Sequence, residues 1–399
     1  MKLKLSNLLF FGILLQIIST QGIMTFNFFK LFGHWELKSV LHPFAVIIII
    51  GYFILKVFYR KKIKISIIDI LLFSYLGLSV IMLVINVNGM KSAYIAFREV
   101  FLLFIMVFIY SQECIDIVKW RKLLKIMYYL SLINLLFIGL TYLLGAEEYM
   151  LLVTGNFHWP IDPEYLFKIS TFSVFWRSPA LIGSAGAVGY FGLISYFLFK
   201  QDEVYKKKRW FPLLLVILSF VRSAYLGLVI YLLLDFFSKN KNWAKLKNML
   251  PYILPVSALI IFPLFKYNIL SIVSIRMRIN HWINDIDTNF NLLFGAAFGK
   301  VGGAVRGEGF IGTLDSYWLL LLMSIGLIGV LLSLLFMYEK AIKNRQILFF
   351  TIAFFMAGFF ITLTQSIPFL VLYPLLFLKK SRNENKIPES SNLKQEHAV

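Results

Sequence analysis

The sequence is poor in cysteine and in charged residues. It holds one cysteine, Cys114, so it can form no intramolecular disulfide and no cysteine-based metal site. Its five histidines include no closely spaced pair, and we therefore expect no zinc centre and no other metal. Only 15% of the 399 residues are charged and 59% are hydrophobic, whereas soluble domains carry roughly 25% charged residues. A soluble core could not bury this apolar surplus, which predicts an integral membrane protein.

Acidic residues are also scarce relative to basic ones. The net charge is +20, from 40 Lys and Arg against 20 Asp and Glu. In a membrane protein such an excess reflects the enrichment of Lys and Arg in cytoplasmic loops, so we expect no nucleic-acid partner. The sequence has no Walker loop, and its glycine-rich stretch at 295–312 does not follow a strand. A dinucleotide site is therefore not expected, and neither is a cofactor.

Long apolar runs predict the membrane-crossing helices, because a crossing needs about 17–25 residues. The run at 5–24 lacks a small-residue cleavage site and is interpreted as a first span that is retained. The single-span candidates are the runs 5–24, 40–58, 67–85, 94–110, 123–144, 181–199, 251–265 and 314–338.

Two further runs are interpreted as pairs of short helices. The run 210–237 has lysine clusters on both flanks, which places both of its ends on the cytoplasmic side. Each half would then have about 14 residues, roughly 21 Å of helix, against about 30 Å of hydrocarbon. We expect a turn near 219–224 that is held in protein or lines a wet cavity. The run 347–378 similarly predicts a bend near 365–368.

These patterns predict an all-α, polytopic membrane protein of the plasma membrane, with both termini cytoplasmic. We expect about 12 transmembrane helices, including two short re-entrant-like pairs, in a single transmembrane domain at 1–380. Two long extracytoplasmic loops are expected at 145–178 and 266–313, and a disordered cytoplasmic tail at 381–399. Long loops in a compact protein are usually functional or disordered.

Arginines at the outer ends of the expected spans are the first functional candidates. They are Arg177, Arg222, Arg276 and Arg278. Guanidinium groups bind phosphate in a bidentate manner, and several that converge on one cavity would suit a diphosphate. The alternative is an interfacial anchor that reaches the lipid headgroups. We favour function for Arg222, favour the anchor for Arg276, and leave both interpretations open for Arg177 and Arg278.

Asp315 is the first candidate for a general base, at the expected outer start of a span. Its alternative role is that of a helix N-cap. His281 and His158 are alternative bases, although a histidine on a loop is more often structural. Trp282 and Trp159 could stack on sugar rings, but tryptophan is also common at membrane interfaces, and we favour that interpretation.

Other charged residues are interpreted structurally. Arg98 and Glu99 open the expected span 94–110, and we favour a local ion pair or an interface anchor. The first outer loop has an acidic character that could orient an acceptor sugar, but we favour a solvated surface. Its acidic residues are Glu147, Glu148, Asp162 and Glu164.

Three stretches of the sequence form a recognisable pattern. The first, at 176–183, reads WRSPALIG, and the second, at 219–227, reads SFVRSAYLG. The third stretch runs in order through Arg278, Trp282, Phe294, Gly295, Gly299, Asp315, Ser316, Tyr317 and the segment IGLIG at 325–329. Together the three stretches resemble the O-antigen polymerase and O-antigen ligase superfamily of bacterial envelope glycosyltransferases. The third is the most specific, and the resemblance as a whole covers under half of the chain.

The resemblance implies metal-independent glycosyl transfer from an undecaprenyl-diphosphate-linked oligosaccharide, with Arg177, Arg222 and Arg278 on the diphosphate. Ligases of this superfamily typically carry histidine at the position of Asp315, which favours a polymerase of O-antigen, capsular or exopolysaccharide repeat units and leaves the base open. Membrane lipid, a flippase and a chain-length regulator would be its partners. The alternatives are a flippase or transporter of the same lipid-linked sugar, or a ligase-type glycan transferase.

Overall fold

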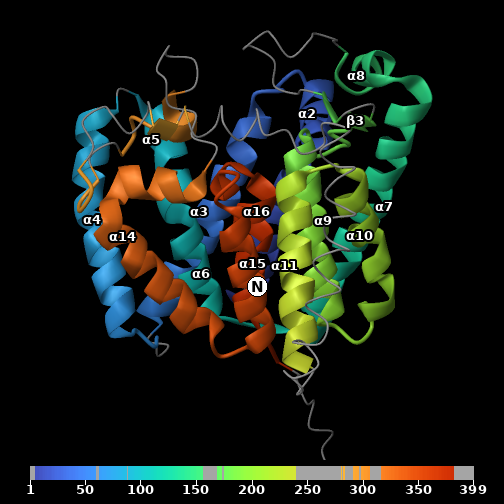
Figure 1. Cartoon of the computed structure of the whole chain (residues 1–399). Coiled ribbons are helices and arrows are strands. Elements are labelled where there is room, and N and C mark those ends of the chain that lie inside the picture. Colours follow the sequence, from blue (N-terminus) through green and yellow to red (C-terminus); the bar gives the residue numbers. More distant parts are fainter. Residues whose placement is uncertain are drawn as a thin grey trace, which may run out of the picture.

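Helices dominate the computed structural model of the chain (Figure 1). Strands in the described part form two small sheets: β1 (Cys114–Asp116) pairs in parallel with β4 (Lys379–Ser381), and β2 (Ser170–Phe172) pairs antiparallel with β3 (Phe175–Arg177). The expected helical class is confirmed. The structure describes residues 5–59, 63–87, 89–155, 169–172, 175–239, 280, 282–283, 291–295, 298–305 and 316–381.

Five helical segments of the described part are long and apolar enough to cross a membrane. Three are unbroken: α3 (Leu37–Phe58), α4 (Ile67–Asn86) and α7 (Ile117–Leu144). The fourth joins α5 (Met90–Phe97), the π-helical η1 (Arg98–Leu102) and α6 (Leu103–Ser111). The fifth is α14 (Tyr317–Ala341). These helices confirm the membrane-protein class.

The expected count of about 12 crossings is not supported. A sixth span is possible only if α1 (Leu5–Ser19) and α2 (Gly22–Leu31) count together, and these two are bent by 96°. The helices α9 (Ala185–Lys200) and α15 (Arg345–Ala357) are apolar but have 16 and 13 residues. They are shorter than the roughly 20 residues that a crossing needs. The expected span at 251–265 lies outside the described residues.

The predicted turn in the run 210–237 is confirmed. Helix α10 (Trp210–Leu218) follows η2 (Lys206–Arg209), and α11 (Arg222–Lys239) begins after a break at 219–221. At the break Phe220 has a φ of 50°. Lys200, at the end of α9, lies 2.8 Å from Asp235 near the end of α11. Because α10 starts shortly after Lys200, α11 returns to the end of the bundle from which α10 departs.

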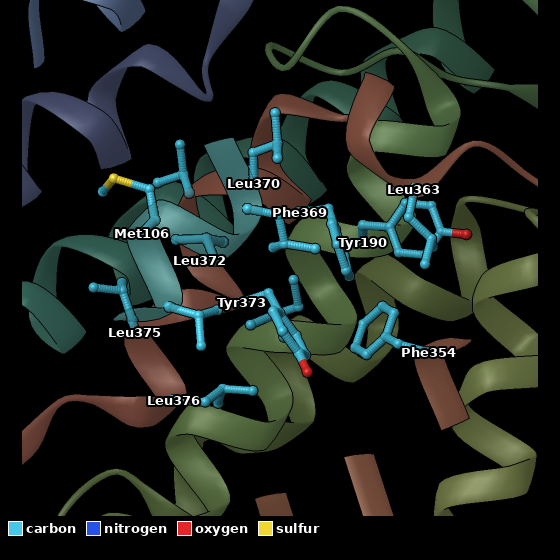
Figure 2. Close-up of a cluster of buried hydrophobic side chains, with 14 of the residues drawn as sticks. Met106, Tyr190, Phe354, Leu363, Phe369, Leu370, Leu372, Tyr373, Leu375 and Leu376 are labelled. Carbon is cyan, nitrogen blue, oxygen red and sulfur yellow. The ribbon is translucent and has the colours of Figure 1, made fainter. Parts of the chain in front are cut away.

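The C-terminal run is also broken, over a longer stretch than the expected bend at 365–368. After α15 the chain passes through η4 (Leu363–Gln365), α16 (Ile367–Leu372) and η5 (Pro374–Phe377) to β4. Figure 2 shows the residues of α16 and η5 in the middle of the apolar core. There Phe369 packs against Tyr190 of α9 and Phe354 of α15. The break is therefore fixed by buried aromatic contacts.

The two ends of the bundle differ in character. Figure 1 places α2, α8 (Ala146–Thr154) and β3 at one end, called here the upper end. The opposite, lower end carries buried ion pairs of three lysines at the helix termini. Lys56 binds Glu113, Lys200 binds Asp235 and Lys340 binds Asp69.

Gly192 sets the spacing between α9 and α10. A Cβ atom at this position would lie 2.7 Å from the carbonyl oxygen of Pro212 and 2.9 Å from the Cβ of Leu215. Gly192→Ala should therefore lower the Tm of the purified protein by several degrees, because overpacking typically costs about 1–3 kcal/mol. Gly186→Ala is the matched control on the same helix, since no atom lies within 4 Å of its added Cβ. Equal Tm values for the two variants would contradict this packing.

Candidate functional site

The structure brings Arg177 and Arg222 into one neighbourhood at the upper end. Phe175 of β3 stacks on Phe220, with ring centroids 5.0 Å apart and planes 9° apart. Side chains two residues apart in a strand lie on one face, so Arg177 shares the face of Phe175. The segments that carry two of the three arginines expected at the diphosphate are therefore in contact.

Arg222 is placed where a helix favours anions. Its side chain is exposed, and it is the first residue of α11, whose first turn contains no acidic residue. The amide groups at a helix N-terminus carry a partial positive charge, which disfavours a cation there and attracts an anion. An arginine at this position weakens the isolated helix but strengthens an anion site.

The segment that follows Arg177 is irregular, buried and fixed by polar side chains. Within 178–183, the amide of Leu181 donates to Asn134 of α7 at 3.0 Å. The hydroxyl of Tyr149 in α8 donates to the carbonyl of Ala180 at 2.9 Å. These side chains satisfy backbone groups that would otherwise be buried without partners. The backbone segment that directly follows Arg177 is therefore held in place by α7 and α8.

This polar support was not predicted from the sequence. Asn134 also donates to the side chain of Gln21 at 2.8 Å, and Gln21 lies at the sharp bend between α1 and α2. The available signal was the presence of an amide in each of the apolar runs 123–144 and 5–24. Polar residues inside a membrane span are usually buried against other protein segments.

Two described parts of the third motif, 291–295 and 325–329, come together at a break in α14. Gly326 has φ 66° and ψ −178°, and Figure 1 shows the two halves of α14 running in different directions. The residues 291–295 pack into this break. The amide of Leu327 donates to Leu292 at 2.8 Å, and the backbone of Gly295 touches that of Gly326. The segment around Gly295 is thus anchored within α14.

The expected bases and the third arginine lie outside the described residues. These are Asp315, His281, His158, Arg278 and also Arg276, together with Trp159. The described N-cap of α14 is the next residue, Ser316, whose Oγ accepts from the amide of Leu319 at 3.5 Å.

Three other candidate residues, Trp282, Glu147 and Glu148, lie in the described part of the chain. Trp282 is half-buried against the apolar cluster of Val301, Leu320 and Met323. Glu147 and Glu148 are exposed in the first turn of α8, as the favoured surface interpretation expects. Asp162 and Glu164 lie outside the described residues.

Arg98 and Glu99 differ from the expected interface anchor. Their ion pair is confirmed, with 3.8 Å between a guanidinium nitrogen and the carboxylate. Glu99, however, is only 1% exposed. Its carboxylate accepts from the amide of Gly303 at 2.9 Å. The pair belongs to the protein interior because the loop residues at 302–303 cover it.

Comparison of the chain with protein families, with curated proteins and with solved structures gives no match. The resemblance to envelope glycosyltransferases therefore depends on the three motifs, whose described parts lie at the Arg177–Arg222 neighbourhood and at the Gly295–Gly326 contact.

Proposed function

We propose that the chain is a glycosyltransferase that polymerises repeat units of an O-antigen, capsular or exopolysaccharide. It would transfer glycan from an undecaprenyl-diphosphate-linked donor to a lipid-linked acceptor at the outer face of the plasma membrane. The observation that carries the proposal is the stacking of Phe175 on Phe220, which brings the segment of Arg177 against that of Arg222 at the start of an apolar helix. Such a site fits a phosphate that enters from the bilayer.

The proposed reaction places negative charge on the departing diphosphate. The bond between the anomeric carbon and the diphosphate oxygen breaks, and the departing oxygen keeps the electron pair. Arg177 and Arg222 stabilise the developing negative charge through bidentate contacts. An acceptor hydroxyl forms the new bond and gives its proton to a base, for which Asp315 is our candidate. Arg278 would complete the diphosphate site from the second outer loop.

The proposed orientation has the upper end outside and the lower end in the cytoplasm. The lysines of the lower end support it, since basic residues concentrate in cytoplasmic loops. In this orientation both termini are cytoplasmic. A flippase would supply the donor, and a chain-length regulator would end elongation.

Reconstitution tests the proposal. Purified protein in proteoliposomes, supplied with undecaprenyl-diphosphate-linked repeat units, should produce a ladder of longer glycans. Arg222→Ala should reduce elongation about 100-fold or more, the loss typical for one electrostatic group in a transition state. Lys207→Ala removes an exposed cation from the lower end and should elongate normally.

The products also separate the alternatives. A flippase would move the lipid across the bilayer without lengthening it, and a ligase would transfer glycan only to a different acceptor. Full elongation by Arg222→Ala, with wild-type expression, would remove Arg222 from the site.

A further inference from the structure

The corner between α2 and α3 carries exposed aromatic side chains at the upper end. It covers residues 26–38 and is called here the aromatic corner. Phe28 packs edge-on against Phe32, with ring centroids 5.2 Å apart. Four large apolar side chains of the corner are between 44% and 85% exposed, and the three nearest α2 follow the spacing of one helix face. The four are Phe28, Leu31, Phe32 and Trp35.

The opposite face of α2 is held by the protein. Asn27 donates to the carbonyl of Val153 in α8 at 2.7 Å, and the ammonium group of Lys30 donates to that of Thr154 at 3.4 Å. Ile23 is fully buried in an apolar cluster that α2 shares with α8. Helix α2 therefore turns one fixed face to the protein and its aromatic face away from it.

Helix α2 runs across the direction of the spans. The contact between α1 and α3 is the most extensive helix pairing of the described part, and a Cβ atom at Gly12 would lie 2.7 Å from the side chain of Ile49. Helix α2 departs from α1 at an angle of 96°. The amide of Ile23 donates to the carbonyl of Leu181 at 2.9 Å, which fixes this bend. The aromatic face therefore lies at the end of the bundle.

The aromatic face is continuous along the chain with the lipid-facing side of α3. Directly after the corner, α3 exposes large apolar side chains at the spacing of one helix face, among them Val40, Phe44 and Ile47. Because α3 is long and apolar enough to cross a membrane, this side of it contacts acyl chains there. The same bilayer can therefore cover the corner.

Two lysines border the aromatic face. The ammonium groups of Lys30 and Lys38 lie 5.8 and 5.9 Å from the ring centroid of Phe26. The Phe26 ring also packs against Trp35, with centroids 6.1 Å apart. One acid, Glu36, lies in the corner, so lysines are in excess. Aromatic rings beside basic side chains are typical of helices that lie in the membrane interface.

We propose that the aromatic corner binds the phospholipid headgroup region of the bilayer at the upper end. Phe28, Phe32 and Trp35 enter the boundary between headgroups and acyl chains. Lys30 and Lys38 contact the lipid phosphates and favour anionic phospholipids. This role does not depend on the proposed glycosyl transfer.

Depth-dependent fluorescence quenching in phospholipid nanodiscs tests the surface. The full-length chain carries Cys114→Ser, which removes its one cysteine, and Phe32→Cys labelled with bimane. Nitroxide-labelled phosphatidylcholines carry the quencher at the headgroup, high on the acyl chain or near the chain end. The headgroup and upper-chain quenchers should act most strongly at position 32, and aqueous iodide should act weakly.

Two further labelled positions calibrate the depth. About 15 Å of helix separates Ile47 from the start of α3 at Leu37. In Ile47→Cys the chain-end quencher should therefore act most strongly. Glu203 is exposed at the lower end, and Glu203→Cys should be quenched mainly by iodide.

Three outcomes at position 32 would overturn the surface. The strongest effect from the chain-end quencher would make α1 and α2 one broken span. Iodide quenching as strong as in Glu203→Cys, with little effect of the lipids, would place the corner in water. Protection from every quencher would mean that another protein segment or a second copy of the chain covers the face.

The lysines are tested with the same label at position 32. Nitroxide-labelled phosphatidylglycerol should quench more strongly than phosphatidylcholine with the same label position, because basic side chains attract anionic lipids. Lys30→Gln combined with Lys38→Gln should abolish this excess and keep the depth order. The control pair Lys206→Gln and Lys207→Gln, at exposed lysines of the lower end, should keep the excess. Equal quenching by the two lipids before any lysine is changed would overturn the role of the lysines.

Discussion

Gly326→Ala should leave little folded protein in the membrane. The backbone of Gly326, at φ 66° and ψ −178°, lies in a region that is essentially restricted to glycine, and strain of this kind costs about 1–3 kcal/mol. The added Cβ would also lie 2.3 Å from the carbonyl oxygen of Leu293 and 2.4 Å from the amide nitrogen of Gly295. The segment 291–295 would have to leave the break in α14.

The readout is the yield of monodisperse protein after detergent extraction, followed by its Tm. Gly77→Ala provides the control, because Gly77 lies inside α4 with no atom within 4 Å of an added Cβ. Alanine is favoured over glycine within a helix, so this variant should match or exceed the wild type. A Gly326→Ala protein with wild-type yield and Tm would show that α14 does not need its break.

The turn between α10 and α11 was predictable from two features of the run 210–237, the basic residues on both of its flanks and its number of residues. Basic residues on both flanks require an even number of crossings, and the run is too short for two full ones. The structure resolves the conflict with a break at 219–221, next to Arg222. The same charge pattern indicated that the C-terminal run turns back, as its pairing with β1 confirms.

Features that depend on distant side chains were not predictable in this way. Nothing in the local sequence distinguishes the π-helix at Arg98–Leu102 from an ordinary helical turn. The burial of Glu99 depends on Gly303, about 200 residues later in the chain. For the same reason the apolar periodicity indicated helices but not that α9 and α15 would end short of a full crossing.

The candidate site was predictable in part. The position of Arg222 followed from the turn, and its proximity to Arg177 depends on the stacking of Phe175 on Phe220, a contact between two segments far apart in the sequence. The possible capping role of Asp315 was a local ambiguity, because Ser316 is an equally good cap and the structure uses it.

Asp69→Ala should be the most destabilising substitution at the lower end. Asp69 lies 2.6 Å from the ammonium group of Lys340, and the two side chains are 1% and 6% exposed. The pair joins the start of α4 to the end of α14, and Asp69 also completes the capping box of α4 with Ser66. Removing Asp69 leaves the buried Lys340 with only the partly exposed carboxylate of Glu339, 3.3 Å away. The loss should therefore approach the roughly 3–5 kcal/mol of a broken buried pair.

A double-mutant cycle separates the ion pair from the loss of the cap. Asp69→Leu combined with Lys340→Met removes both charges and should recover most of the Tm lost in Asp69→Leu alone, because an apolar pair of similar volume is often neutral. Glu203→Ala, at an exposed acid of the same end, should leave the Tm unchanged. If the double variant is no more stable than Asp69→Leu, the cap and not the buried charge fixes the position of α4 against α14.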